Sequence, residues 1–572
     1  MIDITIAEPK KLSNNFTVIQ SAFISFEYNS EIVAYIKSLS TRAYNPDNHT
    51  WEVPVQYLAS FCNKFEDEEI HISGVYKELY TAKSTELPSD YIFKTKPFNH
   101  QIDGIKFGLE KNRWLLCDEQ GLGKSKTVID WVGCLDKTEN INKVLIICGV
   151  NSLKFNWRDE VRTHSNSDSY VLGTRYRKNG NEYIGDTSEK LHDLDNLPEA
   201  KFIITNIETL RAGVIKSKEG KKTVYTFPIA EKIAELCENG TISVVAFDEA
   251  HVCKDITTLQ GMAMGKIHAK YMVAMTGTPI MNSPLDAYFP LHWLGYEEHS
   301  FYQFKMHHCN FGGFNGHEVV GFKNMDSLRE KISQVMLRRL KNEVLDLPEK
   351  IRKIEYVEMN AKQAVLYNEV LFGIKDNINK IKFSNNPLSM LIRLRQATGC
   401  PSIISDKVTE SAKLDRMVEL VDELAQSNQK CIIFSNWESV TEVARQRLAK
   451  YNPAYITGDV KDTDRMTEKE RFQNDPRCKV IIGTRGAMGT GLTLTAAQTV
   501  IFLDSPWNRA LKDQAEDRAH RIGTTGTVNI ITICCKNTID ERIEQLVDKK
   551  GAISDALIDN KVSSADIDFL LS

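Results

Sequence analysis

The chain lacks the marks of a secreted or membrane-bound protein. Its 12 cysteines contain no Cys-x-x-Cys pair, and several lie in apolar runs, which indicates buried free thiols in a reducing compartment. No run approaches the ~20 apolar residues of a membrane span, and the first residues lack the charged and apolar regions of a signal peptide. We therefore expect a soluble intracellular protein without a membrane partner.

A large charge of one sign is also absent, because 72 basic residues face 76 acidic ones for a net charge of −4. If the protein binds nucleic acid, its positive surface must be local. The 572 residues are too many for one core and predict about three or four domains.

The stretch that organises the chain runs from residue 114 to residue 125. The apolar run Trp114–Cys117 predicts a short buried strand, and residues 126–131 have a helical pattern. Between them, Gly121 and Gly123 allow the backbone to curl so that successive N–H groups face an anion. Strand, glycine turn and helix are together what a phosphate-binding loop needs.

The side chains of this loop fit ATP and Mg²⁺. Lys124 can reach the β and γ phosphates, and the Ser125 hydroxyl can hold Mg²⁺. Asp118 is a departure, because the usual pattern has glycine six positions before the lysine. Gln101, upstream, has both donors and an acceptor for the edge of adenine. The candidate loop residues are Asp118, Glu119, Gln120, Gly121, Leu122, Gly123, Lys124 and Ser125.

Alternating strands and helices follow the loop. Four short, continuous apolar runs are typical of strands buried on both faces of a parallel sheet; they are residues 144–148, 202–205, 243–247 and 271–275. Polar motifs follow three of them, at residues 206–211, 248–251 and 276–279. Since ligands of open α/β sheets bind at the carboxyl ends of the strands, these motifs should surround one crevice.

Asp248-Glu-Ala-His251 supplies the candidate catalytic carboxylates. We expect Asp248 to hold Mg²⁺ with Ser125. Glu249 is placed to polarise the attacking water, and His251 to sense the γ phosphate.

The alternation stops at residues 296–355. His307, His308, Cys309 and His317 suggest zinc, but their spacing fits no closed tetrahedral site. Residues 336–348 predict a basic helix leading into a turn, whose Arg338, Arg339 and Lys341 either face phosphates or form a solvated face.

A second alternating block, at residues 356–545, has no phosphate loop of its own. Its expected strands are residues 431–434, 480–483, 500–503 and 529–533. The helix after the third strand carries Gln514, Arg518 and Arg521, and the two arginines, three apart, should share one face. Arginine at a γ phosphate stabilises charge in the transition state. Taken alone, the pair would more simply be two solvated side chains.

Together these motifs resemble the Swi/Snf-type branch of the superfamily-two helicase-like ATPases, over residues 90 to 550. The resemblance rests on Asp118–Ser125, in which the family itself has Asp in place of the first glycine, and on Asp248–His251, Thr276–Pro279, Leu394–Gln396, Gly489–Thr493 and Asp513–Gly523. It implies an α/β fold with two RecA-like parallel-sheet lobes, ATP between them and double-stranded DNA across both. Gln514, Arg518 and Arg521 would join Lys124, Asp248 and Glu249 in catalysis.

The resemblance also implies contacts to DNA that are largely independent of sequence and sensitive to salt. The implied DNA-binding residues are Asn151, Ser152, Asn206, Thr209, Thr276, Arg338, Arg339, Ser435, Asn436, Trp437, Thr484, Arg485 and Trp507. The expected domains are residues 1–85, 90–295 (lobe 1), 296–355 (helical insertion), 356–545 (lobe 2) and 546–572 (a brace or tail).

The first ~85 residues predict a small α+β module. It resembles the HARP domain of annealing helicases through Phe26, Tyr28, Ser40, Arg42, Tyr44, Trp51 and Pro54. Core packing is the simpler explanation of each aromatic residue alone. The resemblance implies binding of forked DNA. No chromodomain, bromodomain, RING-type cysteine set or nuclease motif is recognisable, which suggests a bacterial or phage protein. We expect it to be monomeric, cytoplasmic and associated with the nucleoid; a eukaryotic version would be nuclear.

The main hypothesis is a DNA-stimulated ATPase that translocates on duplex DNA and remodels or re-anneals it, or strips bound protein such as RNA polymerase. An RNA helicase is an alternative, since Asp-Glu-Ala-His names such a group, although those enzymes typically place glycines among the arginines of the last motif. A third hypothesis is an ATP-gated DNA clamp or loader that does not translocate, because such a protein would use the same motifs.

Overall fold

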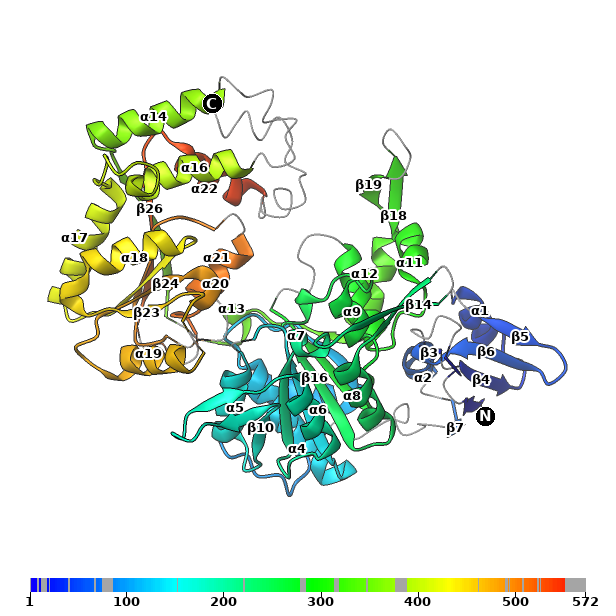
Figure 1. Cartoon of the computed structure of the whole chain (residues 1–572). Coiled ribbons are helices and arrows are strands. Elements are labelled where there is room, and N and C mark those ends of the chain that lie inside the picture. Colours follow the sequence, from blue (N-terminus) through cyan, green and yellow to red (C-terminus); the bar gives the residue numbers. More distant parts are fainter. Residues whose placement is uncertain are drawn as a thin grey trace. The chain divides into compact units, whose positions relative to one another are not determined.

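The computed structural model describes residues 2–7, 10–11, 18–19, 21–39, 42–65, 68–74, 86–151, 153–219, 222–277, 284–312, 318–345, 348–375, 388–460, 462–488, 492, 494–506, 509–521, 524 and 526–550 (Figure 1). The chain divides into two compact units. Unit 1 holds residues 1–119 and 123–339, and unit 2 holds residues 120–122 and 340–572. The boundary at residues 339 and 340 falls inside the segment expected as an insertion.

Unit 1 is built on a seven-stranded sheet with the order β10-β13-β9-β16-β17-β8-β20, in which every neighbouring pair is parallel. The strands are β8 (Arg113–Leu116), β9 (Lys143–Cys148), β10 (Ser169–Val171), β13 (Phe202–Asn206), β16 (Ile242–Asp248), β17 (Tyr271–Met275) and β20 (Met336–Leu337). All side chains of β13 and β17 are buried, as apolar strands covered on both faces must be.

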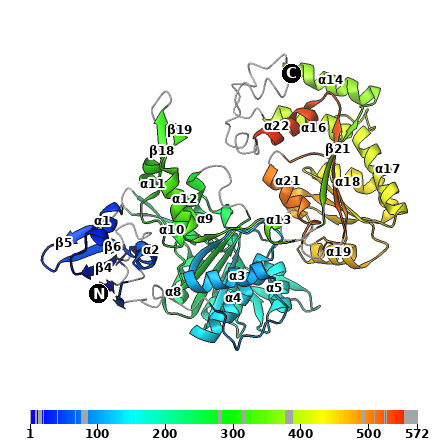
Figure 2. The ribbon, with the colours of Figure 1, turned by 180° about the vertical axis from the view of Figure 1, so that it is seen from behind.

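Helices cover both faces of this sheet. Apolar side chains of α3, α4 and α5 form one core with one face of the sheet, which Figure 2 shows from that side. Those of α8, α9 and α10 form the other core, on the face seen in Figure 1. The helices of unit 1 beyond the front module are α3 (Asn99–Lys111), α4 (Lys124–Glu139), α5 (Leu153–His164), α6 (Thr187–Asp195), α7 (Ile207–Leu210), α8 (Pro228–Glu238), α9 (Leu259–Met264), α10 (Tyr288–Trp293), α11 (Phe301–His308) and α12 (Met325–Ser333).

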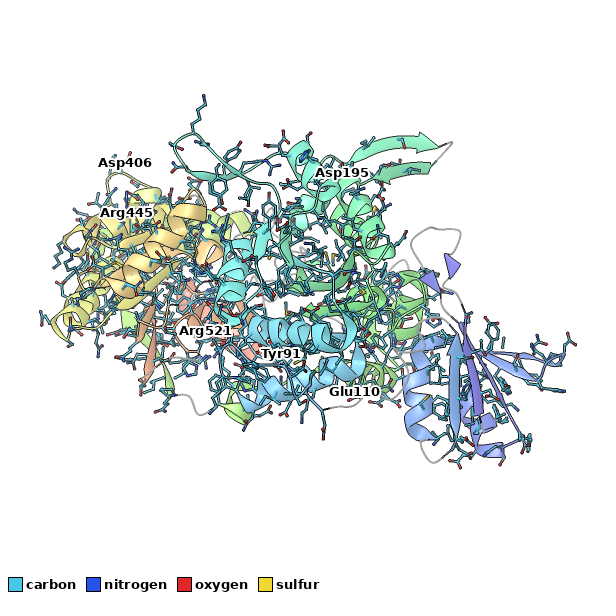
Figure 3. All side chains as sticks on the ribbon, turned by 90° about the horizontal axis from the view of Figure 1, so that it is seen from below. Tyr91, Glu110, Asp195, Asp406, Arg445 and Arg521 are labelled. Carbon is cyan, nitrogen blue, oxygen red and sulfur yellow. The ribbon has the colours of Figure 1, made fainter. Side chains whose placement is uncertain are left out.

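A buried ion pair fastens the segment before α3 to this unit. Tyr91, labelled in Figure 3, donates from its hydroxyl to Asp130 of α4 at 2.9 Å. Lys126 donates to the same carboxylate at 2.6 Å and to the carbonyl oxygen of Thr95 at 2.9 Å. The carboxylate thus holds together a helix and a segment that has no regular structure of its own.

The front module of unit 1 has its own mixed sheet, with the order β5-β6-β4-β1-β7. Ile2, Ile4 and Ile6 alternate inward along β1 and pack with Ile32 and Ile36 of α1, so one face of the sheet is buried. The elements are β1 (Ile2–Ile6), β4 (Ser21–Phe26), β5 (Ala43–Asn45), β6 (Thr50–Pro54), β7 (Ile70–Gly74), α1 (Ser30–Ser38) and α2 (Leu58–Lys64).

Short antiparallel hairpins complete unit 1. They are β2 (Lys10–Lys11) with β3 (Val18–Ile19), β11 (Thr174–Tyr176) with β12 (Glu182–Ile184), β14 (Ile215–Glu219) with β15 (Lys222–Thr226), and β18 (Cys309–Gly312) with β19 (Glu318–Phe322).

Unit 2 contains a six-stranded sheet with the order β21-β26-β25-β22-β24-β23, again parallel throughout. Its strands are β21 (Lys350–Val357), β22 (Cys431–Ser435), β23 (Ala454–Ile456), β24 (Val480–Thr484), β25 (Thr499–Phe502) and β26 (Val528–Cys535). Its helices are α13 (Lys341–Val344), α14 (Ala361–Lys375), α16 (Leu388–Gly399), α17 (Ala412–Gln426), α18 (Glu438–Arg447), α19 (Asp462–Asn474), α20 (Arg485–Met488), α21 (Arg509–Glu516) and α22 (Ile539–Lys550). Separate apolar cores lie on its two faces.

The α/β fold class with two parallel-sheet units and a small α+β module is confirmed. No helix within the described residues is long and apolar enough to span a membrane. The prediction of buried free thiols is also confirmed, since all 12 cysteines are free and only Cys62 is partly exposed.

Two local predictions are wrong. Residues 336–348 do not form one basic helix, because Met336–Leu337 extends the sheet as β20 and only Lys341–Val344 is helical. The helix expected to carry both arginines ends at Glu516, so Arg518 and Arg521 lie in the turns after α21. In both places contacts with the sheet override the helical spacing.

Candidate active site

The loop after β8 has the backbone geometry of an anion cradle. Gly121 and Gly123 have φ of +87° and +77°, a region that costs other residues about 1–2 kcal/mol. Gly123 is the N-cap of α4, a 16-residue helix that begins at Lys124. The partial positive charge and open N–H groups of that helix end therefore face the loop.

Gln101 of α3 packs against this turn. Its side chain is 1% exposed, and its Oε1 accepts a hydrogen bond from the backbone N–H of Phe98 at 3.0 Å. A Cβ on Gly123 would lie 2.3 Å from Gln101 Nε2. The Gln101 amide, which is predicted to bind adenine, therefore also packs against the loop. Its oxygen can accept a hydrogen bond from adenine only by sharing or releasing the hydrogen bond from Phe98.

Lys124 folds back onto its own loop. Its Nζ donates to the carbonyl oxygen of Asp118 at 2.8 Å and lies 3.5 Å from that of Glu119. Phosphate oxygens are stronger acceptors for a charged amine than peptide carbonyls. The Lys124 amine can therefore exchange the two carbonyl oxygens for a phosphate oxygen when a nucleotide binds.

Asp248 ends β16, the strand beside β9 in the middle of the sheet. Trp157 Nε1 of α5 donates to its Oδ2 at 2.8 Å, and the backbone N–H of Glu249 donates to its Oδ1 at 2.9 Å. Burial, and next the charge of Glu249, raise the pKa of Asp248 to about 6, against the lowering effect of Trp157 and Lys124. A partly buried carboxylate of this kind favours a bound cation, which would stabilise its charged form.

Glu249 has a strained backbone, with φ of +52°, in a conformation that non-glycine residues rarely adopt. Its Oε2 lies 3.2 Å from His251 Nδ1, and Thr276 Oγ1 lies 3.0 Å from the same nitrogen. Glu249, His251 and Thr276 thus form one connected polar group at the ends of β16 and β17. Thr276, predicted to contact DNA, is 2% exposed and lies within hydrogen-bond distance of His251.

The donor set fits Mg²⁺ bound with ATP. Ser125 is the second residue of α4, and Asp248 ends a strand of the same sheet. Hydroxyl and carboxylate oxygens are the ligands that Mg²⁺ prefers. These two residues would hold the ion, which would neutralise charge on the phosphate oxygens.

The predicted DNA contacts of unit 1 differ in exposure. Asn206 and Thr209 are 4% and 5% exposed, and Asn206 Oδ1 accepts from the Thr209 hydroxyl at 2.7 Å. These two side chains therefore satisfy each other at the start of α7. Asn151 is exposed just before α5, and Ser152 lies outside the described residues.

Arg338 and Arg339 differ in exposure and in their partners. Arg338 is exposed and remains available to phosphates. Arg339 makes an ion pair with buried Asp118, with Nη2 2.5 Å from Oδ2. Lys341, 6% exposed, pairs with Asp517 at 2.7 Å. Of the two alternatives for these residues, a solvated face is wrong for Arg339 and Lys341, because carboxylates of the chain hold both side chains.

In unit 2, Asp504 organises the predicted DNA-contact loop after β22. The Ser435 hydroxyl donates to Asp504 Oδ2 at 2.5 Å, and the backbone N–H of Asn436 donates to its Oδ1 at 2.9 Å. Ser435 is 1% exposed, so it supports the loop instead of reaching a surface ligand. Arg485 Nε lies 3.4 Å from Asn436 Oδ1, and burial lowers the pKa of this guanidinium.

Trp437 follows in the same loop, and the guanidinium of Arg395 lies 4.9 Å from the centre of a Trp437 ring. Arg395 is itself buried and pairs with Asp504 at 3.7 Å. Thr484 ends β24 and is partly buried. Trp507 lies outside the described residues.

Carboxylates anchor the turn that carries the two catalytic arginine candidates. Arg352 of β21 binds Glu516 at 2.6 Å, and Lys350 lies 3.4 Å from Asp517. Arg518 is 5% exposed and donates to the carbonyl oxygens of Gln514 and Leu492, each at 3.2 Å. Arg521, labelled in Figure 3, and Gln514 are partly buried.

Sequence reasoning missed Trp157 and Asp504, and it did not predict the supporting roles of Arg339 and Arg395. Only Asp504 had a usable signal, since it directly follows an expected strand. The zinc suggestion gains no support, because no group of metal-ligating side chains occurs among the described residues, and His317 lies outside them.

A glycine cradle at a helix N-terminus and a partly buried acidic strand end lie on one edge of a parallel sheet. Together they define a nucleotide-binding protein with groups suited to phosphoryl transfer. Comparison with known families identifies which one. Residues 100–403, more than half of the chain, match the SNF2-related domain, and residues 412–523 match the helicase conserved C-terminal domain. The chain belongs to the SNF2-related family and also contains the helicase conserved C-terminal domain.

Curated relatives agree with this assignment. An uncharacterised ATP-dependent helicase of Mycoplasma pneumoniae is 26% identical over 93% of this chain and 49% of its own length. A putative ATP-dependent helicase/translocase of Bacillus subtilis, YwqA, is 26% identical over 78% of this chain and 46% of its own. The DNA annealing helicase and endonuclease ZRANB3 of Bos taurus is 26% identical over 83% and 41%. The chain spans about half the length of these relatives.

Among solved structures, the Sulfolobus solfataricus SWI2/SNF2 ATPase core in complex with double-stranded DNA is 24% identical, over 85% of this chain and 99% of that one, with a TM-score of 0.36.

Replacing Gly123 by Ala tests the cradle. The substitution adds both left-handed strain and a 2.3 Å contact with Gln101, so we expect loss of measurable nucleotide binding in a fluorescent-ATP titration. Gly180→Ala is the matched control, because Gly180 has φ of +81° but open space around its Cβ position. Equal nucleotide affinities in the two variants would show that the packing of Gln101 against Gly123 is not needed for nucleotide binding.

Proposed function

We propose that this protein is a DNA-stimulated ATPase that moves along double-stranded DNA and remodels or re-anneals it. One observation carries the proposal: the lysine-bearing loop at the start of α4 lies on the same sheet edge as Asp248, Glu249 and His251. That arrangement suits ATP hydrolysis. The family and the names of the relatives support DNA as the track. We propose that the protein acts as a monomer in the cytoplasm of a bacterial or phage-infected cell.

The residues of unit 1 divide the work of hydrolysis. Lys124 binds the β and γ phosphates after leaving the carbonyl oxygens of Asp118 and Glu119. Glu249 orients and polarises the water that attacks the γ phosphorus. His251 lies within ion-pair distance of Glu249 and contacts Thr276, so it can convey a change at the γ phosphate to the end of β17.

Unit 2 supplies positive charge for the same reaction. We assign Arg518 and Arg521 to the negative charge that develops on the γ phosphate, where such arginines are worth about 10³–10⁵ in kcat. Gln514 is proposed to act with them. The ion pairs from Glu516 and Asp517 to β21 fix this turn, so the arginines need little reorganisation during turnover.

DNA is proposed to bind mainly through its phosphates. The candidates that keep some exposure and are not held by a carboxylate ion pair are Asn151, Arg338, Asn436, Trp437, Thr484 and Arg485. With a net charge of −4 the attraction must be local, so binding should weaken steeply as salt increases.

The test of function is the steady-state ATPase rate with no nucleic acid, single-stranded DNA, duplex DNA, forked DNA or structured RNA, each at two salt concentrations. We expect duplex or forked DNA to stimulate the rate, and the DNA concentration for half-maximal stimulation to rise with salt. Displacement of a third-strand oligonucleotide, coupled to hydrolysis, separates translocation from a clamp that only opens and closes. Stimulation by RNA alone would point to an RNA helicase.

Two single substitutions separate nucleotide binding from chemistry. Lys124→Ala should lose nucleotide binding, because it removes the cation that meets the phosphates. Glu249→Gln should keep ATP and DNA binding but lose turnover by about 10²–10⁴-fold, the usual contribution of a general base. Fluorescent-ATP titration and single-turnover hydrolysis measure the two effects. A Glu249→Gln enzyme that turns over normally would remove this residue from the mechanism.

The front module is proposed to be HARP-like and to direct the motor to forked DNA. Tyr28 is 86% exposed and Tyr44 is 47% exposed. The ring centres of Tyr44 and Trp51 lie 4.8 Å apart. Arg42 is also exposed. Exposed aromatic rings beside a cation suit the unpaired bases and phosphates of a fork.

Replacing Tyr28 and Tyr44 together by Ala should lower affinity for forked DNA, since each stacked base lost costs about 1–3 kcal/mol. Duplex-stimulated ATPase should stay close to that of the wild type. Tyr176→Ala removes another exposed tyrosine of unit 1, from β11, and serves as the control. An unchanged ratio of fork to duplex affinity in the double variant would remove the proposed fork preference.

A further inference from the structure

The start of the phosphate loop is hydrogen-bonded to the segment that ends unit 1. Alternate backbone N–H groups along β8 and beyond it donate to carbonyl oxygens of that segment: Leu115 to Val335 at 2.8 Å, Cys117 to Leu337 at 2.7 Å, and Glu119 to Arg339 at 3.0 Å. The ladder therefore continues past the last strand residue of β8 and includes the first residues of the loop.

A side-chain ion pair reinforces the last step of this ladder. Arg339 binds Asp118 through two nitrogens, with Nε 3.0 Å from Oδ1 and Nη2 2.5 Å from Oδ2. Asp118 is fully buried, and the side chain of Arg339 is only 12% exposed. Arg339 Nη1 also donates to the carbonyl oxygen of His100, in the first turn of α3. One guanidinium thus joins the loop, α3 and the end of unit 1.

Helix α3 packs closely against this guanidinium and against α4 at Gly104. A Cβ on Gly104 of α3 would lie 3.1 Å from Arg339 Nη2 and 2.8 Å from a methyl carbon of Thr127 of α4. Asp118 is not among the described residues with positive φ, so glycine is not needed at this position for its backbone. The aspartate that departs from the usual loop pattern therefore serves as a side-chain anchor.

This anchor holds the same peptide groups that Lys124 uses. The amine of Lys124 donates to the carbonyl oxygen of Asp118 and approaches that of Glu119. When Lys124 turns to a phosphate, those two carbonyls lose their cation, while Arg339 still holds the Asp118 side chain and the Glu119 N–H. The chain passes from unit 1 to unit 2 directly after Arg339.

We propose that the Asp118–Arg339 ion pair is a positioning device that couples nucleotide binding at the loop to the segment by which the chain leaves unit 1. The proposal rests on the proposed function, because it requires ATP to bind at this loop. A two-nitrogen salt bridge suits the task, since it fixes orientation as well as distance. Both residues act through the loop backbone and not on the reacting atoms.

The test combines nucleotide affinity with hydrogen–deuterium exchange in the full-length chain. In the wild type, ATP should slow exchange at the Glu119 amide and in peptides covering residues 335–345. Arg339→Lys keeps the positive charge but loses the planar guanidinium that binds Asp118 through two nitrogens. It should weaken ATP binding by about five- to tenfold, within the usual range of coupling between sites, and abolish the slowing at residues 335–345. Asp118→Asn should do the same.

The double variant, Asp118→Asn with Arg339→Gln, separates coupling from simple loss of stability. If the two side chains act as a pair, its ATP affinity should be no lower than that of Asp118→Asn alone. Asp193→Asn is the matched control, because Asp193 is a buried carboxylate of unit 1 that Arg175 binds at 2.9 Å. It should lower the melting temperature and leave ATP affinity unchanged.

Each outcome decides between support and rejection. Loss of ATP affinity together with loss of the exchange response, in Arg339→Lys but not in Asp193→Asn, supports the coupling. Wild-type affinity and response in Arg339→Lys would overturn it while leaving the proposed function intact. A wild-type protein that binds no ATP would refute both. Lower melting temperature alone, in Arg339→Lys and Asp193→Asn alike, would reduce the pair to a structural role.

Discussion

The reversal of the chain between β8 and α4 is the constraint on which unit 1 depends. A buried parallel strand must pass directly into a long helix, and the turn has to bring the N-terminal end of that helix toward the ligand. Gly123 allows this conformation, and Gln101 blocks any larger residue there. Helix α3 is therefore as much a part of the loop as the glycines are.

In unit 2, ion pairs hold the turn that carries Arg518 and Arg521. Glu516 and Asp517 are bound to basic residues of β21 and α13. Buried ion pairs of this kind add little net stability but are costly to break on one side only. Their value here is orientation. Asp504 has the same function for the loop after β22, where it fixes Asn436 and Ser435.

Five of the seven strands in the unit 1 sheet, four of the six in the unit 2 sheet and the phosphate loop could be predicted from the sequence, because each is a local signal. The strands β10, β20, β21 and β23 were not predicted. Continuous apolar runs identify strands buried on both faces, and glycine spacing identifies the turn. The failures came from contacts between residues far apart in the chain. Residues 336–348 have helical spacing, but pairing with β8 makes Met336 and Leu337 a strand. No local pattern could show that Arg339 lies against Asp118, 221 residues away.

The same limit applies to the predicted DNA contacts, whose roles remain predictions. Four of the polar residues expected to contact DNA are buried and bonded to neighbours; they are Thr276, Asn206, Thr209 and Ser435. A strand end in a parallel sheet needs polar groups to finish the backbone as well as to bind ligands. Sequence position alone does not distinguish these two uses.

The burial of the cysteines has a practical consequence for watching this protein work. Eleven of the 12 thiols are buried, and for the exception, Cys62, burial of the sulfur raises the pKa to about 11. Since the thiolate is the reactive form, none of these groups competes well for maleimide dyes near neutral pH. A cysteine placed on an exposed surface of each unit would therefore accept a fluorophore selectively, and single-molecule energy transfer could follow each cycle of hydrolysis on one DNA molecule.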